Sequence, residues 1–181
     1  MKIDFKEEIV LPEKVEAKYD CGLLIVKGPK GEVKKKLLNK KIMILAEKGK
    51  IILESLQGTK RDKRQLYTFY SHAKNMVQGV SEGHFCELKI CSGHFPMTLT
   101  VVGEDLTVKN FLGENFPRKL KLKPGVKVVV EGDKIRIDGP DKELVGQAAA
   151  DIETLTWVRG RDRRIFQDGV FIINKDGKLI K

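Results

Sequence analysis

Four arginines near the end of the sequence have the residue type and spacing best suited to binding nucleic acid. They are Arg159, Arg161, Arg163 and Arg164, with Trp157 before them and Phe166 after them. A guanidinium group grips a phosphate through two hydrogen bonds and stacks on a base, which an ammonium group cannot do. Arginines beside aromatic rings are typical of proteins that bind irregular RNA. The two rings could also anchor the segment to the protein core, an alternative that is compatible with arginines facing RNA.

A second cluster raises the possibility of a zinc site, because two cysteines and two histidines lie within eleven positions. They are His84, Cys86, Cys91 and His94. The cluster lacks the close ligand pair, such as Cys-x2-Cys, that structural zinc usually needs. On one strand, Cys86 and Cys91 would face opposite sides. We therefore predict no metal, with buried cysteines and solvated histidines, although a break near Ser92-Gly93 leaves zinc open.

No motif points to catalysis. The stretch Gly28-Pro29-Lys30-Gly31 lacks the Gly-Lys-Ser/Thr ending of a phosphate-binding loop, and no nucleophile elbow is found. His72 has no carboxylate at matching helical spacing. We predict that the protein is not an enzyme and binds no cofactor. The alternatives kept open are an RNA-processing enzyme and a zinc-dependent adaptor.

The composition agrees with an RNA partner. The 181 residues have a formal net charge of +10, and 41% are hydrophobic, enough for packed cores. The start alternates charged and apolar residues, and no apolar run is long enough to span a membrane. We expect a cytoplasmic protein without membrane or DNA partners. The odd cysteine count, Cys21 included, predicts small buried hydrophobic residues and not disulfides.

The chain also predicts an internal repeat. Residues 11–33 and 122–144 match without a gap, and in each copy two alternating segments flank a tight turn and end at Gly-Pro. This pattern is typical of a β-hairpin with one buried face. The run Lys34-Lys35-Lys36 follows the first copy, and it suits either RNA or the guarded edge of a sheet.

Each predicted repeat ends in a helix. Thr59 and Asp62 form a capping box before an apolar stripe from Leu66 to Val80, and Asp141 caps a second stripe. Further strands are predicted at residues 42–47, 51–55, 85–90, 98–102, 106–110 and 119–122. We predict an α+β fold of two tandem duplicated domains, each a small antiparallel sheet packed against one helix. The predicted division is 1–82, 83–156 and a basic tail, 157–181.

Four stretches make the family recognisable: His94-Phe95-Pro96-Met97, Asn110-Phe111-Leu112-Gly113-Glu114 with Pro117-Arg118, residues 144–149, and residues 162–172. On these, the chain resembles the ribosomal protein L-six family, the universal sixth protein of the large subunit, in its archaeal and eukaryotic branch. The likeness runs from about Ile9 to Lys175.

The resemblance implies a structural protein of the large ribosomal subunit in the cytoplasm. It implies two duplicated α+β domains that bind large-subunit rRNA near the sarcin–ricin loop, next to other ribosomal proteins and the site of the translation GTPases. Carried over to this sequence, it places Arg159, Arg161, Arg163 and Arg164 against rRNA, with Lys175 and His94 as further contacts.

Overall fold

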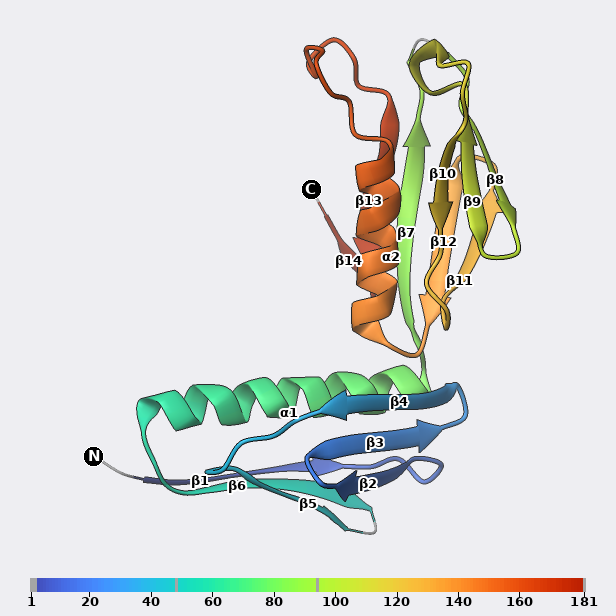
Figure 1. Cartoon of the computed structure of the whole chain (residues 1–181). Coiled ribbons are helices and arrows are strands. Elements are labelled where there is room, and N and C mark those ends of the chain that lie inside the picture. The colour runs from blue at the N-terminus through green and yellow to red at the C-terminus, as the bar shows by residue number, and fades with distance from the viewer. Residues whose placement is uncertain (1–2, 48, 94, 181) are drawn as a thin grey trace. The chain divides into compact units, whose positions relative to one another are not determined.

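The computed structural model describes residues 3–47, 49–93 and 95–180. These residues form two compact units, Met1–Gly83 and His84–Lys181. Each unit contains one α-helix, and all strand pairs in the described residues are antiparallel (Figure 1). The predicted α+β fold is therefore confirmed. No helix among the described residues has the length and apolar character to cross a membrane.

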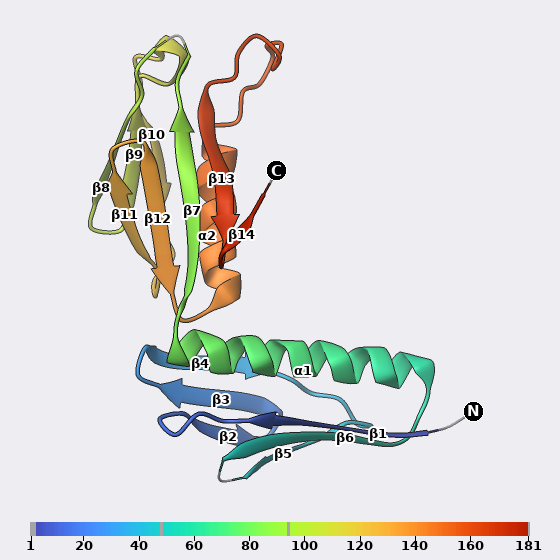
Figure 2. The ribbon, with the colours of Figure 1, turned by 180° about the vertical axis from the view of Figure 1, so that it is seen from behind.

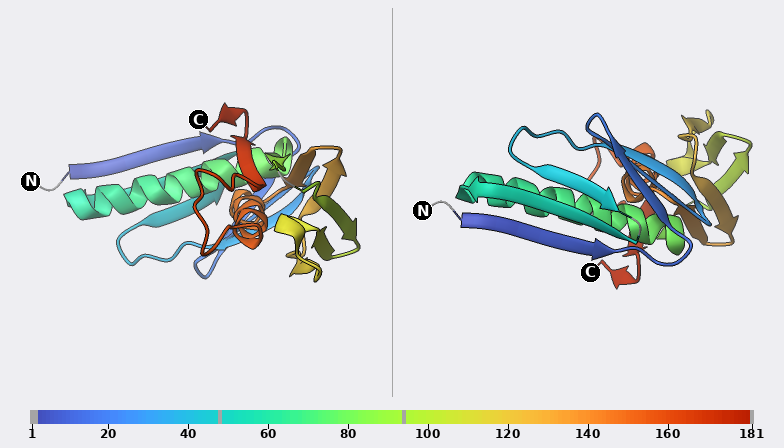
Figure 3. Two further views of the ribbon diagram at one scale, coloured as in Figure 1. Left: turned by 90° about the horizontal axis from the view of Figure 1, so that it is seen from above. Right: turned by 90° about the horizontal axis from the view of Figure 1, so that it is seen from below.

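The first unit has six strands and one helix. They are β1 (Ile3–Val10), β2 (Glu16–Asp20), β3 (Leu23–Gly28), β4 (Gly31–Lys36), β5 (Met43–Glu47), β6 (Lys50–Gly58) and α1 (Lys60–Ser81). They form two sheets, ordered β1-β6-β5 and β2-β3-β4. Figure 3 shows α1 running along the strands of its own unit. β4, with the three lysines, is a sheet edge.

Helix α1 forms for the reasons that its sequence predicts. The Thr59 side chain accepts a hydrogen bond from the Asp62 backbone N–H, and the Asp62 carboxylate accepts one from the Thr59 N–H at 2.9 Å. This reciprocal box satisfies two donors that the first turn leaves unpaired. The stripe that begins at Leu66 and ends at Val80 is buried against the sheets.

The second unit has the same parts and two added strands. They are β7 (His84–Cys91), β8 (Thr98–Val102), β9 (Asp105–Lys109), a 3-10 turn (Phe111–Gly113), β10 (Arg118–Lys121), β11 (Lys127–Glu131), β12 (Lys134–Gly139), α2 (Lys142–Leu155), β13 (Gly169–Lys175) and β14 (Lys178–Leu179). The sheets are ordered β11-β12-β7-β13-β14 and β10-β9-β8. Seen from behind, β7 lies between β12 and β13 (Figure 2).

The duplication is real, but the predicted pairing of segments is wrong. The sheet orders β5-β6-β1 and β11-β12-β7 correspond, as do β2-β3-β4 and β8-β9-β10. The hairpin at 11–33 therefore corresponds to β8-β9, and not to the β11-β12 hairpin with which we had matched it. Alternating hairpins with tight turns resemble one another along any chain, since all bury one face. Past the matched Gly-Pro pairs, one copy continues as strand β4 and the other as helix α2.

The predicted basic tail is partly a strand of the sheet. β13 pairs with β7 from Gly169↔Cys91 to Lys175↔Cys86. Residues 169–175 therefore belong to the five-stranded sheet of the second unit. The segment between α2 and β13 is an exposed connection, and it contains all four arginines.

Candidate nucleic-acid interface

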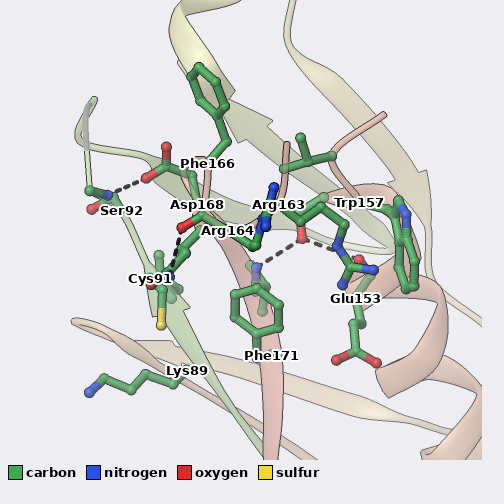
Figure 4. Close-up of a pocket in the computed structure, with 16 residues that line it drawn as sticks. Lys89, Cys91, Ser92, Glu153, Trp157, Arg163, Arg164, Phe166, Asp168 and Phe171 are labelled. Atoms are coloured by element: carbon green, nitrogen blue, oxygen red, sulfur yellow. Dashed lines mark hydrogen bonds between the residues drawn. The ribbon is translucent and has the colours of Figure 1, made fainter. Parts of the chain in front are cut away.

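The arginines lie on the connection 157–168, which we call the arginine loop. Figure 4 shows two of them, Arg163 and Arg164. A turn centred on Asp162 shapes it, because the Asp162 carbonyl accepts the backbone N–H groups of Ile165 and Phe166 at 3.1 and 2.9 Å. The Asp162 side chain also accepts the N–H of Arg164 at 3.0 Å. Aspartate favours such turns because its short side chain bonds to the backbone two residues on. The loop thus has defined internal bonds.

Two of the arginines stack on the aromatic residues that flank the cluster. The guanidinium carbon of Arg163 lies 4.1 Å from the ring centroid of Trp157, and that of Arg161 lies 5.0 Å from the centroid of Phe166. Both distances fit cation–π contacts. Phe166 packs against the core, whereas Trp157 is 45% exposed. The expected anchoring role therefore fits Phe166, and Trp157 mainly supports Arg163.

Arg164 is held by an ion pair inside the loop. Its Nη2 lies 2.8 Å from Asp162 Oδ2, and its Nε lies 3.1 Å from Oδ1. The hydrogen bonds from the Arg164 side chain and backbone lower the pKa of the Asp162 carboxyl. At neutral pH the loop therefore contains a carboxylate that offsets one of its four positive charges.

The arginine loop is tied to the second unit at its C-terminal end. Asp168 is buried, and its carboxylate accepts a hydrogen bond from the Gly93 N–H beyond β7. The buried Thr156 hydroxyl, one residue before the loop, accepts the N–H of Val170 at 2.9 Å. These bonds fix both ends of the loop against β7 and β13.

A cavity of about 810 Å³ lies between the arginine loop and the neighbouring elements (Figure 4). Its lining comes from the end of β7, the end of α2, the loop and β13, and includes Cys91, Trp157, Arg163, Phe166, Asp168 and Phe171. Aromatic rings and guanidinium groups thus share one concave surface.

The other two predicted contacts are not part of this cluster. Lys175 is exposed at the far end of β13 from the loop, six residue steps or roughly 20 Å along the strand from Gly169. His94 lies outside the described residues. The structure therefore brings the four arginines together and leaves Lys175 apart.

The cysteine and histidine cluster is not assembled as a metal site in the described residues. Cys86 is buried and Cys91 half-buried on opposite faces of β7, as predicted. His84 is buried, and its Nδ1 lies 2.8 Å from Asp176 Oδ2, so the expectation that it is solvated was wrong. Cys21 is exposed in a tight turn, and its predicted burial was also wrong. No group of three metal-ligating side chains occurs within 3–47, 49–93 and 95–180.

The sequence reading missed an aromatic feature beside the arginine loop. Phe116 is 86% exposed, in the connection between the 3-10 turn and β10. Arg118, the first residue of β10, is structural, since it stacks on Phe111 at 4.3 Å and donates to the Leu155 carbonyl at 2.6 Å. A bulky apolar residue before Pro117, in a polar stretch, was the available signal.

Comparison with known proteins decides the family. Residues 11–83 and 95–169 match the family described as Ribosomal protein L6. A Methanococcus vannielii protein named large ribosomal subunit protein uL6 is 41% identical over 175 residues, covering 97% of this chain and 96% of the relative. The chain belongs to the ribosomal protein L6 family. A second uL6, from Methanobrevibacter smithii, is 40% identical over 171 residues, or 94% of this chain and 96% of that protein.

Membership of the L6 family accounts for the repeat. The two matched segments, 11–83 and 95–169, fall in the first and second units, and the second contains the arginine loop. Ribosomal protein L6 is a structural ribosomal component without enzymatic activity, so the family confirms the prediction that this chain is not an enzyme.

Proposed function

We propose that this protein is a structural constituent of the large ribosomal subunit and binds large-subunit rRNA through its arginine loop. The observation that supports this most is the geometry of the loop. Arg161 and Arg163 are stacked on Phe166 and Trp157, and Arg164 is held by Asp162. Side chains held in place lose less conformational entropy when they bind, so their contacts with phosphates yield more affinity.

The role is architectural. Guanidinium groups neutralise phosphates and release counterions, which fixes the protein and the RNA helices in register. The cavity beside the loop adds aromatic surface for irregular RNA. Recognition then depends mainly on RNA shape and phosphate position. We propose two separate, weaker contacts: Lys175, at the end of β13 away from the arginine loop, and His94.

A finer position of the protein within the subunit is part of the same proposal. We propose that the second unit lies near the sarcin–ricin loop, between rRNA and neighbouring ribosomal proteins, with the translation GTPases binding close by. The family name supports the subunit and its rRNA, and the family resemblance is the basis for this finer placement. Localisation in the cytoplasm follows from assembly into the subunit.

The direct test removes positive charge from the loop. In the triple variant Arg161→Ala, Arg163→Ala, Arg164→Ala, binding to in vitro transcribed large-subunit rRNA should weaken. For the native protein, four neutralised phosphates give a log–log salt slope of roughly −3 to −4, and the variant should flatten it by roughly 2 to 3. Unchanged affinity and slope would contradict the proposal.

A matched control removes three charges from the first unit. Lys14, Lys18 and Lys36 are exposed there, and their replacement by Ala changes the net charge equally. This variant should keep most of its affinity. If both triple variants lose equal affinity, the binding is unspecific attraction to a basic protein. Sedimentation is the cellular test: the native chain should travel with the large subunit, and the loop variant should be released at lower salt.

A further inference from the structure

Phe116 is exposed to solvent on the short connection between the 3-10 turn and β10. Its ring is 86% exposed, the most of any large hydrophobic residue within the described ranges. An exposed aromatic ring on a monomer is common when it stands alone on a flexible segment, and it then needs no explanation. The surroundings of Phe116 are different, because the loop 114–117, which we call the phenylalanine loop, is bonded at both ends.

The bonds at the two ends keep the phenylalanine loop in place. At its start, the Glu114 N–H donates to the Phe111 carbonyl at 2.9 Å, and at its end Pro117 leads into β10. The Glu114 carboxylate receives two hydrogen bonds from Arg118, at 2.6 and 2.8 Å, which bridge the loop. The Phe116 ring is therefore presented to solvent on a short segment whose flanking residues, Glu114 and Arg118, are joined by hydrogen bonds.

The phenylalanine loop lies at the same end of the second unit as the arginine loop. β8 and β9 are antiparallel, so the connections before Thr98 and after Lys109 share one end of the sheet, and Asn110 Nδ2 bonds to the Pro96 carbonyl at 3.1 Å. Figure 1 shows these connections and the arginine loop at one end of the unit. The hydrogen bonds and the charge of Arg118 lower the pKa of the Glu114 carboxyl, and the positive charge of Arg161 in the arginine loop adds a smaller effect in the same direction.

We propose that Phe116 stacks on an unpaired base of the rRNA that the arginine loop binds. This rests on the proposed function and adds a second kind of contact to it. RNA that is held by its phosphates at the arginine loop brings its single-stranded segments to this end of the unit, and an aromatic ring is the side chain on which such bases stack. The charge of the neighbouring loop favours RNA over an apolar protein segment as the occupant.

The test uses the whole chain and in vitro transcribed large-subunit rRNA. Phe116→Ala should weaken binding roughly 5- to 150-fold, the range for loss of one base-stacking ring, and leave the salt slope unchanged. Phe116→Trp should retain native affinity, since it keeps a stacking surface. Val102, which is 78% exposed, is the last residue of β8 and lies at the opposite end of this sheet. It is the control, and Val102→Ala should bind as the native protein does.

Native affinity in Phe116→Ala would overturn the stacking contact. The proposed function would survive that result if the arginine triple variant has a lower affinity for rRNA than the native protein. If Phe116→Ala binds rRNA normally yet fails to enter the subunit, the stacking contact is likewise overturned, because the ring then contacts a protein. Loss in Phe116→Ala that Phe116→Trp does not restore would also reject stacking. Because the ring is exposed, thermal unfolding of all three variants should match the native protein.

Discussion

The guanidinium carbon of Arg163 lies 4.1 Å from the ring centroid of Trp157, six residues earlier in the chain. Both residues line the cavity beside the arginine loop. A cation–π contact at an exposed site contributes about 0.5–1 kcal/mol. The contact therefore restricts Arg163 without preventing it from turning toward a phosphate.

We predict that removal of the Trp157 ring weakens RNA binding even though it removes no charge. Trp157→Ala should raise the Kd for large-subunit rRNA about 2- to 6-fold, the equivalent of the lost stack, with an unchanged salt slope. The Kd of Trp157→Phe should lie between that of Trp157→Ala and that of the native protein. Filter binding at several salt concentrations measures both quantities, and a changed slope in Trp157→Ala would mean that the ring does more than position Arg163.

Cysteine reactivity should report where RNA lies on the second unit. Cys91 lines the cavity beside the arginine loop, whereas Cys21 is exposed in the first unit. Bound rRNA should slow the alkylation of Cys91 several-fold and leave that of Cys21 unchanged, as peptide mass spectrometry would show. Burial raises the pKa of the Cys86 thiol to about 11, so Cys86 should react only on unfolding and serves as the internal control. Equal protection of Cys21 would point to a different binding face.

Local signals predicted most of the fold because each refers to neighbouring residues. The capping residues Thr59 and Asp141 start α1 and α2 where the sequence indicates. Pairing between distant segments was harder. Alternation fixes which face of a strand is buried but not which strand lies beside it, so the repeat was matched at the wrong offset. The insertion of β13 next to β7 is a pairing of this kind, and the arginines that precede this apolar strand led to its inclusion in a predicted basic tail.

In the candidate site, too, the features that depend on neighbouring residues could be predicted, and those that depend on distant residues could not. The arginine cluster is contiguous in sequence, so composition reveals it. For Phe116 the sequence offers only a weak signal, a bulky apolar residue before Pro117 in a polar stretch. Its exposure and its neighbours, which a sequence does not state, make it notable. The His84–Asp176 pair joins residues 92 positions apart. No local pattern could distinguish this buried pair from a solvated histidine.

We predict that the edge of β13 depends on Thr156. The buried hydroxyl of Thr156 accepts the Val170 N–H at 2.9 Å. Thr156→Val keeps the shape of the side chain and removes the acceptor, leaving a buried donor unpaired at a cost of about 1–3 kcal/mol. Urea unfolding should show this loss, and Thr100→Val, on an exposed position of β8, should show none. Equal stability of the two variants would mean that another acceptor replaces the hydroxyl.

The Asp176 carboxylate should make the second unit sensitive to acid. Its Oδ1 accepts the Phe85 N–H at 2.9 Å, and its Oδ2 lies 2.8 Å from His84 Nδ1 and 3.5 Å from Lys142 Nζ. Partial burial raises the pKa of Asp176, but the hydrogen bonds from Phe85 and His84 and the charges of His84 and Lys142 lower it by more. The folded pKa thus lies below that of the unfolded chain, so the carboxylate stabilises the fold above the unfolded value, about 3.9, and loses this effect as pH falls through the folded value.

Asp176→Asn tests this without disturbing the backbone, because asparagine tolerates the left-handed conformation found there, with φ of 48°. The variant should be less stable than the native protein at pH 5, and the difference in unfolding free energy should shrink between pH 4 and pH 2. Asp133→Asn, which removes a charge from an exposed turn of the same unit, should show no such convergence. Because neutral asparagine cannot gain a proton, a difference that stays constant down to pH 2 would mean that Asp176 acts through its hydrogen-bond geometry and not through its charge.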